Sequence, residues 1–431
     1  MIRLSFPTKK LRKYIKRVNV KLKDTKYNQN DLIVYGVTNT EGITITGNQT
    51  SEDLSNYIVL KENQLVYNPY RVNVGSIGLT PKGLLGLVSP AYIVFETTED
   101  LNAEFLYYYL KSSLGINLIK WYGDRGGVRS ALRYEDLCEI DIPDLNLIQQ
   151  MYVLNKMKKV STEIEKYNSE ICYQEELISK LRQSILQEAV QGKLVPQDPN
   201  DESASVLLER IKKEKERLIK ESKIKKEKPL PPISEDEIPY ELPEGWEWVR
   251  FEKIARIASK PVNPEKYPNM FHIAPDNIEK GTGKLLLYRT VIEDGVKSVN
   301  HYFYPGQILY SKIRPNLSKA VIVEFEGLCS ADIYPIVSYI NTKYLLYFIL
   351  SKTFLNQVVL RDNRVKMPKI NQNDLNKVLV AVPPLNEQKR IVEKVDQLMA
   401  LCDELEKNIE QSKKDSELLM QSVLQEAFKG A

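Results

Sequence analysis

Basic and amide side chains recur in two loops, and each loop follows a short apolar segment. The loops lie within residues 67–76 and 310–319, and each contains an arginine two positions before an asparagine. Lysine and arginine bind DNA phosphates, while arginine and asparagine can also make paired hydrogen bonds with guanine and adenine. A second basic patch occurs within residues 121–133 and again within 361–369. The recurrence of both patches favours nucleic-acid binding over the alternative for each residue, which is an ordinary solvated loop.

The residues predicted to contact DNA belong to these four segments. Gly126 and Gly127 would let the backbone of the first half approach a ligand closely. The predicted contacts are Arg71, Asn73, Ser76, Arg125, Arg129 and Arg133 in the first half, and Lys312, Arg314, Asn316, Lys319, Arg361, Arg364, Lys366 and Lys369 in the second. Because the two sets differ in composition, we expect the two halves to recognise different DNA sequences.

Motifs for catalysis by histidine or by nucleotide hydrolysis are missing from the sequence. The two histidines, His272 and His301, both lie in the second half, so no duplicated histidine site exists. The sequence contains no GxxxxGK[ST] phosphate-binding loop and no GxGxxG motif. We therefore expect this chain to bind no cofactor of its own.

Two weaker catalytic signals are rejected. The stretch Asn68-Pro69-Tyr70 lacks the second proline of the amino-methyltransferase motif, and no glycine-rich cofactor loop precedes it. Asp332 with Glu324 or Glu326 could form a nuclease carboxylate cluster, but the first half offers Ala91 or Tyr92 at the matching place. We therefore expect no catalytic residue and no metal site.

Length and composition are typical of a globular protein with two or three domains. The 431 residues carry a net charge of +4, which is too small to identify a partner. The four cysteines are far apart and form no CxxC pair, which argues against disulfides or a cysteine zinc site. No apolar run approaches the roughly 20 residues of a membrane span, and the N-terminus does not resemble a signal peptide. We expect a cytoplasmic protein without a membrane partner.

One segment is repeated 238 residues further along the chain. Ser184-Ile-Leu-Gln-Glu-Ala-Val-Gln-Gly192 returns as Ser422-Val-Leu-Gln-Glu-Ala-Phe-Lys-Gly430. The period far exceeds the roughly 20–50 residues of solenoid repeats, so it indicates a duplicated module. Aromatic helices are expected at 102–112 and 341–351. Each module ends in a proline-containing exit. We expect the first exit to carry two inserted residues, since Asn146-Leu-Ile-Gln-Gln replaces Asn386-Glu-Gln.

A long helix is predicted after each exit, at about 147–190 and about 387–428. Apolar residues recur there at alternating steps of four and three, which is the a/d seam of a coiled coil. Each helix would be on the order of 65 Å long at 1.5 Å per residue. We expect the two apolar stripes to bury each other. Both an antiparallel and a parallel pair agree with the pattern.

Three stretches of this sequence resemble the specificity subunit of type I restriction–modification systems. Residues 181–215 are similar to the family's central conserved region, and Leu242-Pro-Glu-Gly-Trp246 resembles the start of a target recognition domain. Val382-Pro-Pro-Leu-Asn-Glu-Gln-Lys-Arg-Ile-Val392 resembles the beginning of the C-terminal conserved helix. The N-terminus has no Leu-Pro-x-Gly-Trp counterpart, which leaves the start of the first domain undefined.

The resemblance implies an α+β fold with a pseudo-twofold internal repeat. Two α/β target recognition domains would be separated by a long antiparallel two-helix coiled coil. The expected segments are a first recognition domain at 1–146, a central conserved region with a spacer helix and a charged helix at 147–228, a second recognition domain at 229–386, and the C-terminal conserved helix at 387–431.

The resemblance also implies function and partners. Each recognition domain would bind one half of a bipartite, asymmetric site in double-stranded DNA, and the paired helices would set the spacer between the halves. Two modification (methyltransferase) subunits would dock on the helices, and restriction subunits (translocase and endonuclease) would join them. S-adenosylmethionine, ATP and Mg²⁺ would act in those partners. The alternatives are a coiled-coil scaffold without its own sequence readout and, less favoured, an enzyme.

Overall fold

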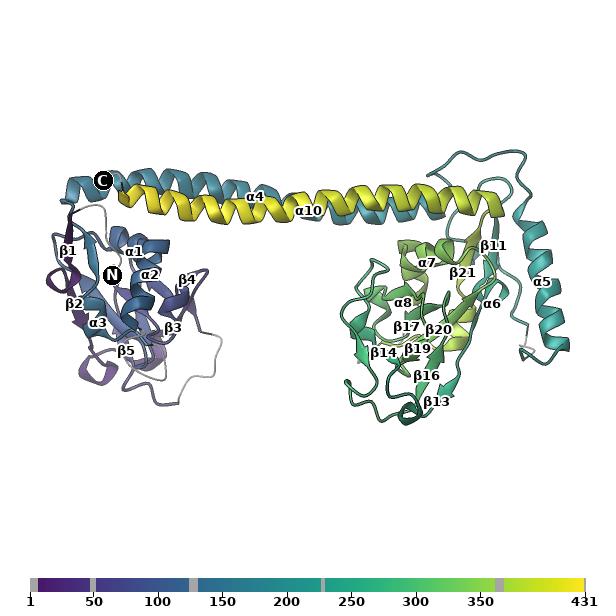
Figure 1. Cartoon of the computed structure of the whole chain (residues 1–431), viewed down its shortest axis with the longest axis horizontal. Helices are drawn as coiled ribbons and strands as arrows, with labels where there is room; N and C mark the ends of the chain where they lie inside the picture. Colours follow the sequence, from purple (N-terminus) through teal and green to yellow (C-terminus); the bar gives the residue numbers. More distant parts are fainter. Residues whose placement is uncertain (1–6, 47–51, 124–130, 226–228, 361–367, 430–431) are drawn as a thin grey trace. The chain divides into compact units, whose positions relative to one another are not determined.

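The structure is a computed structural model that describes residues 7–46, 52–123, 131–225, 229–360 and 368–429. The chain divides into two compact units, the first formed by residues 1–173 and 409–431 and the second by residues 174–408. Each unit contains one globular domain and part of both long helices (Figure 1). The two units are described separately below.

The first domain, residues 8–143, has two sheets and a short ribbon in its described part. Neighbours in the first sheet, ordered β2-β9-β6-β7, are antiparallel. The second sheet is ordered β4-β3-β8-β5 and pairs β3 with β8 in parallel. The strands are β1 (Thr8–Lys10), β2 (Ile15–Val18), β3 (Ile33–Thr38), β4 (Gly42–Ile45), β5 (Ile58–Leu60), β6 (Leu65–Tyr67), β7 (Ile77–Leu79), β8 (Gly86–Val88), β9 (Ile93–Thr97) and β10 (Asp141–Pro143).

The second domain, residues 247–382, repeats this topology. Its antiparallel sheet is ordered β12-β20-β17-β18, and its other sheet is ordered β13-β16-β19-β14-β15, with β14 parallel to β19. The strands are β11 (Glu247–Arg250), β12 (Ala255–Ile257), β13 (Pro261–Val262), β14 (Phe271–Ile273), β15 (Arg289–Thr290), β16 (Asn300–Phe303), β17 (Ile308–Ser311), β18 (Ala320–Ile322), β19 (Gly327–Cys329), β20 (Ile333–Ser338) and β21 (Leu379–Val382). The duplication inferred from sequence therefore extends to the order of strands.

Helices occupy matching places in the two domains. An asparagine begins each aromatic helix, since Asn102 accepts a hydrogen bond from the Phe105 N–H and Asn341 accepts one from the Tyr344 N–H. The helices are α1 (Ala103–Lys111), α2 (Ser113–Gly123) and α3 (Tyr134–Cys138) in the first domain, and α6 (Phe251–Ile254), α7 (Thr342–Leu350), α8 (Lys352–Leu360) and α9 (Gln372–Asn376) in the second. α5 (Ala204–Lys220) precedes the second domain.

Aromatic side chains of the sheet and of the following helix form the core of each domain. Tyr67 of β6 and Phe95 of β9 are fully buried, with ring centroids 6.1 Å apart at an edge-on angle. In the second domain Tyr310 of β17 packs edge-on against Phe354 of α8 at 5.7 Å. These cores hold the strand ends, and the loops that follow them, in fixed positions.

A buried glutamine in the first turn of each long helix attaches that helix to its own domain. In the first unit, the Gln150 side chain accepts a hydrogen bond from the Asn102 N–H at 2.8 Å. It also donates one to the Leu145 carbonyl at 2.9 Å. Its side chain is fully buried, so these hydrogen bonds replace contacts with water.

Gln388 makes the same contacts in the second unit. It accepts from the Asn341 N–H at 2.9 Å and donates to the Pro383 carbonyl at 2.9 Å. Gln150 and Gln388 are 238 residues apart, which is the offset of the sequence repeat. The expected insertion of two residues in the first exit is therefore wrong, because that alignment matched the exit asparagines instead of the buried glutamines.

The long helices are α4 (Leu147–Val190) and α10 (Leu385–Lys429), and they lie side by side (Figure 1). In the second unit, Arg182 pairs with Glu406 at 2.9 Å, while Gln197, just beyond α4, reaches Glu387 at the start of α10 at 3.3 Å. As the residue numbers rise along α4 and the loop after it, the numbers of their partners on α10 fall. The pair is antiparallel, as the resemblance implied.

The coiled-coil seam is buried mainly along one of its two columns; in the other column Val153 and Ile391, at the ends of the helices that adjoin the domains, are also buried. The buried seam positions recur every seven residues and are Met157, Ile164, Ile171, Ile178 and Ile185 on α4, and Val395, Cys402, Ile409 and Ser416 on α10. The alternate seam positions Tyr167, Leu181 and Leu405 are 45–46% exposed. The expectation that the two stripes bury each other is therefore wrong for these positions of the second column. The helices meet along a narrower line than full heptad packing would give.

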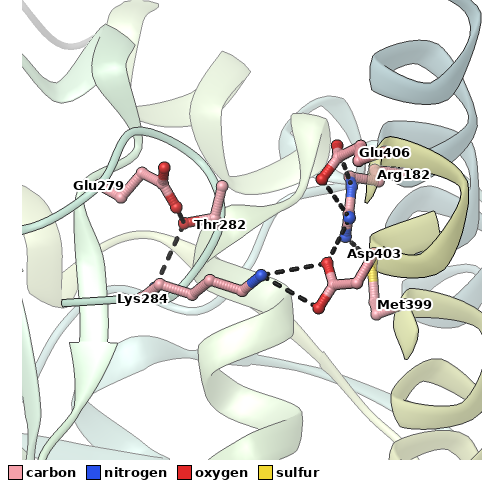
Figure 2. A network of polar contacts seen from close by, with 7 residues as sticks. All are labelled: Arg182, Glu279, Thr282, Lys284, Met399, Asp403 and Glu406. Carbon is pink, nitrogen blue, oxygen red and sulfur yellow. Dashed lines mark hydrogen bonds and ion pairs between the residues drawn. The ribbon is translucent and has the colours of Figure 1, made fainter. Parts of the chain in front are cut away.

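Asp403 of α10 connects the helix pair of the second unit to the second domain (Figure 2). Both of its carboxylate oxygens accept from the Lys284 ammonium at 3.0 Å, and it also pairs with the Arg182 guanidinium of α4. One carboxylate therefore joins three elements. Lys284 lies in the loop before β15, so this loop is fixed against the helices.

Candidate nucleic-acid interface

The basic loops predicted from sequence follow equivalent strands. The first loop leaves β6 and enters a short 3₁₀ helix at Val72–Val74, and the second leaves β17 and enters one at Pro315–Leu317. Arg71 and Arg314 stand directly before these 3₁₀ helices, and both are exposed. The repeated scaffold thus places one exposed arginine at the same point of each domain.

Main-chain hydrogen bonds join the two predicted patches within each domain. In the first domain, the Leu132 N–H donates to the Pro69 carbonyl at 3.0 Å. In the second, the Ile370 N–H donates to the Lys312 carbonyl and the Arg314 N–H donates to the Pro368 carbonyl, both at 2.9 Å. Segments about sixty residues apart in sequence therefore form one continuous surface in each domain.

The surface of the first domain, here called the first patch, consists of Arg17, Tyr70, Arg71, Asn73 and Arg133. An open hollow of about 460 Å³ lies beside Tyr70 and is flanked by Arg17 and Arg133. Tyr70 is 62% exposed, so its ring is available for stacking. The patch combines cationic and aromatic groups, as nucleic-acid surfaces commonly do.

Arg17 was not predicted from the sequence. It lies on β2, and its guanidinium is 5.7 Å from the centre of the Tyr134 ring. Burial is the main cause that raises the pKa of Tyr134 to about 12, so this phenol stays neutral. Its hydroxyl donates to the Ile15 carbonyl at 3.3 Å. Only the pairing of distant strands brings Arg17 to Arg133, and no local sequence signal indicates it.

Ser76 does not belong to the accessible part of the first patch. Its side chain is only 3% exposed, at the point where the chain enters β7. Backbone hydrogen bonds hold this position, since the Ser76 N–H donates to the Arg71 carbonyl at 3.2 Å. We therefore omit Ser76 from the proposed contacts.

The surface of the second domain, here called the second patch, consists of Lys312, Arg314, Asn316, Asp332 and Lys369. Arg314 has a left-handed backbone, with φ of 46°, which is uncommon outside glycine and directs the chain into the following turn. Arg314 and Asn316 are exposed. These two side chains are thus accessible to a ligand.

Lys319 has a structural partner. Its ammonium donates to the Pro275 carbonyl at 2.8 Å and lies 3.6 Å from the Asp276 carboxylate. The side chain is 15% exposed. Lys319 therefore fastens the loop before β18 to the neighbouring 3₁₀ helix, Pro275–Asn277.

Asp332 holds the two lysines of the second patch together. Its Oδ1 atom is 3.1 Å from the Lys369 ammonium and 3.9 Å from the Lys312 ammonium. The Lys312 ammonium also lies 5.4 Å from the centre of the Tyr334 ring. Burial, with a smaller contribution from the positive charge of Lys312, lowers the pKa of His301. His301 is therefore neutral near pH 7 and adds no charge to the patch.

Five predicted contacts, Arg125, Arg129, Arg361, Arg364 and Lys366, lie outside the described residues. The described chain resumes at 131 and at 368, directly beside the first and second patches. Their roles remain predictions from the sequence.

The carboxylates considered for nuclease chemistry have other partners. Asp332 pairs with lysines, and Glu326 accepts a hydrogen bond from the Tyr302 hydroxyl at 2.6 Å. Among the described residues, no group of three histidine, cysteine or acidic side chains could hold a metal ion. Within that same part of the chain, no helix is long and apolar enough to cross a membrane.

Comparisons with known proteins identify similar sequences. A family model described as the type I restriction modification DNA specificity domain matches residues 243–412. The chain is 36% identical over 330 residues to the type I restriction enzyme EcoDI specificity subunit of Escherichia coli, covering 77% of this chain and 70% of that protein. It is 40% identical over 243 residues to the EcoAI specificity subunit of Escherichia coli, covering 53% of this chain and 41% of that protein.

Solved structures have a similar fold. A chain from a structure of a type I R-M system superposes with a TM-score of 0.66 at 16% identity and covers 100% of both chains. The HsdS subunit from Thermoanaerobacter tengcongensis superposes with a TM-score of 0.50 at 16% identity, covering 100% of this chain and 98% of that one. At this level of identity the similarity concerns the fold.

Proposed function

Because the chain belongs to the family of type I restriction enzyme specificity subunits, we propose that each of its domains reads one half of a bipartite, asymmetric DNA site. One observation carries this proposal. In both domains, distant basic segments are joined by main-chain hydrogen bonds at the same place on a repeated scaffold. Two similar surfaces in one chain suit a target with two halves.

The side chains of the two patches differ, which supports two different half-sites. The first patch has arginines and a tyrosine beside an open hollow, while the second has two lysines bracketing a carboxylate. Arg71 and Arg314 occupy equivalent positions and would make the contacts common to both halves. Arginine can bind either a phosphate or the edge of guanine, so these residues are candidates for both roles.

The long helices would set the spacing and bind the modification subunits. In the second unit, a groove of about 340 Å³ lies between α4 and α10 and is lined by Leu181, Leu398, Leu401 and Leu405 among others. Leu181 and Leu401 are 45% and 56% exposed, which leaves apolar surface for a partner to cover. Half-sites would lie about one DNA turn apart, as for other two-headed readers.

The chemistry of the complex would belong to its other subunits. Two modification subunits would transfer methyl groups from S-adenosylmethionine, and restriction subunits would use ATP and Mg²⁺. This chain would be non-catalytic and would act in the cytoplasm. Its role would be to select the DNA site at which those subunits act.

Selection from random-sequence duplexes tests the proposal. The chain is assembled with its cognate modification subunits, and the bound DNA is sequenced after repeated rounds. Enrichment of one motif with two specific halves and a fixed unspecific spacer supports the proposal. If the bound pool keeps no sequence preference, the chain is a scaffold and the proposed function is wrong.

A further inference from the structure

Three charged groups of the second patch come from three separate segments. Lys312 follows β17, Asp332 precedes β20, and Lys369 precedes α9. Both ammonium groups lie near the same carboxylate oxygen, at 3.9 Å and 3.1 Å. The three side chains are 24%, 35% and 33% exposed, so the group is accessible from solvent.

The backbone holds this carboxylate between the lysines. The Lys312 N–H donates to the Asp332 carbonyl at 2.9 Å, and the Ile370 N–H donates to the Lys312 carbonyl at 2.9 Å. The Asp332 N–H in turn donates to the Ser330 hydroxyl at 3.2 Å. The arrangement is therefore fixed by main-chain hydrogen bonds, independently of the ion pairs.

The first domain makes the same junction without any of these charges. Tyr67 opposes Ile93 where Tyr310 opposes Tyr334, which fixes the structural alignment of the two sheets. By that alignment, and by the matching hydrogen bonds of the loops, Lys312, Asp332 and Lys369 correspond to Pro69, Ala91 and Ala131. The fold therefore does not require Asp332.

The two ion pairs of Asp332 also add little to the stability of the fold, because half-exposed ion pairs contribute only about 0–1 kcal/mol. Its electrostatic effect is larger for a ligand, since it cancels one of two positive charges on a surface proposed to bind DNA. A carboxylate oxygen between two ammonium groups occupies the place that a phosphate oxygen would take. His301, which is neutral near pH 7, does not compensate for it.

We propose that Asp332 mimics a DNA phosphate and lowers the affinity of the second domain for non-cognate DNA. This inference rests on the proposed function. Asp332 competes for Lys312 and Lys369, so the lysines bind phosphate strongly only when base contacts elsewhere in the domain hold the DNA in place. Asp332 is thus a residue that increases specificity by weakening unspecific binding.

Replacing the carboxylate with its neutral amide tests the inference. Dissociation constants of the full-length chain, assembled with its modification subunits, are measured on a mixed-sequence duplex at several salt concentrations. We expect Asp332→Asn to bind roughly fivefold more tightly at low salt, because one repulsive charge is removed at about 4 Å. The slope of log K against log salt should steepen by about 0.9, the value for one further phosphate contact.

Asp276→Asn is the matched control. Asp276 is a fully exposed aspartate 3.6 Å from Lys319 in the same domain, so the variant removes the same charge beside a lysine held by a carbonyl. Asp276→Asn should leave the dissociation constant for the mixed-sequence duplex nearly unchanged. Equal effects of both variants would indicate net charge alone and would contradict the inference.

Two other results would also overturn it. Unchanged or weaker binding by Asp332→Asn, repeated with Asp332→Ala, would mean that the carboxylate only orders the lysines. A loss confined to the cognate duplex would mean that Asp332 reads a base. If the wild-type complex bound no DNA at any salt concentration, the proposed function itself would fail. That result concerns the wild type and is therefore distinguishable from the two results for the Asp332 variants.

Discussion

At the scale of single residues, Arg71 and Arg314 are the clearest matched pair in the molecule. Each follows the equivalent strand, precedes a 3₁₀ helix and is exposed. Their neighbours in the patches differ, because the first patch contains Arg17 and Arg133, while the second contains Lys312 and Lys369 at positions that are not equivalent to these. The shared arginines would anchor DNA, and the residues around them would distinguish the half-sites.

Arg314→Ala should weaken binding of the cognate duplex by roughly tenfold or more, as expected for loss of a phosphate or base contact worth about 1–3 kcal/mol. Alanine also carries a Cβ, so the left-handed backbone at this position is equally strained in both proteins. The dissociation constant of the assembled complex is the measurement. Arg210→Ala, which removes an exposed arginine of α5 paired with Glu202, is the control and should have little effect.

The sequence predicted residues that follow each other along the chain and missed those that meet through the fold. Arg71 and Arg314 were recognisable because each is followed by an asparagine at the same spacing. Arg17 comes from β2, and only the sheet brings it beside Arg133. Ser76 looked like an accessible loop residue, but it directly precedes β7 and is buried.

At the scale of elements, the buried glutamines attach each domain to its long helix. Gln388 forms hydrogen bonds with the Asn341 N–H and the Pro383 carbonyl, and its side chain is fully buried. Both partners lose their hydrogen bond if the amide is removed. The fold is therefore sensitive to the loss of this polar side chain at the start of α10.

Gln388→Ala should reduce the free energy of unfolding by about 2–4 kcal/mol, because it leaves a buried donor and a buried acceptor unsatisfied. Denaturant unfolding of the full-length chain measures the change. Lys389→Ala alters the next, exposed residue of the same helix and should cost little. Equal stability of Gln388→Ala and wild type would show that the glutamine does not hold the domain.

The ion pair between Glu237 and Arg250 should make stability depend on acid pH. Hydrogen bonds from the Arg250 guanidinium, at 2.6 and 2.7 Å, are the main cause that lowers the pKa of Glu237 from 4.5 to about 2. An acid with a lowered pKa in the folded state stabilises the protein above its unfolded pKa. That contribution is present above about pH 4.5 and is lost as the pH falls towards 2.

Glu237→Gln removes this dependence. The difference in unfolding free energy between wild type and variant should be largest near neutral pH and should shrink between about pH 4.5 and pH 2. Urea unfolding across this range measures it. Glu235→Gln is the control, because Glu235 is an exposed residue of the same 3₁₀ helix, Glu235–Glu237. A difference that stays constant with pH would contradict the assigned cause.

The long helices show both the strength and the limit of periodicity. Their bounds and the buried column at Met157, Ile164 and Ile171 follow the heptad pattern. Leu181 and Leu405 of the second column fit the same pattern yet are exposed. Periodicity identifies apolar positions on a helix face, but it does not state whether the partner that covers them belongs to the same chain.

At the scale of the whole molecule, duplication explains why the two units share their architecture. A repeated strand order and the same glutamine attachment to a long helix occur in both units. The surface residues of the two patches, by contrast, differ in charge. The two halves thus share one architecture and differ in the surfaces that we propose contact DNA.

Sequencing of the methylated bases in the host genome, with and without this chain, tests the central claim most directly. The account predicts that deletion of the chain abolishes methylation at one asymmetric motif with two specific halves, and that restoring the chain restores it. Methylation that persists unchanged at every motif after deletion would contradict the account.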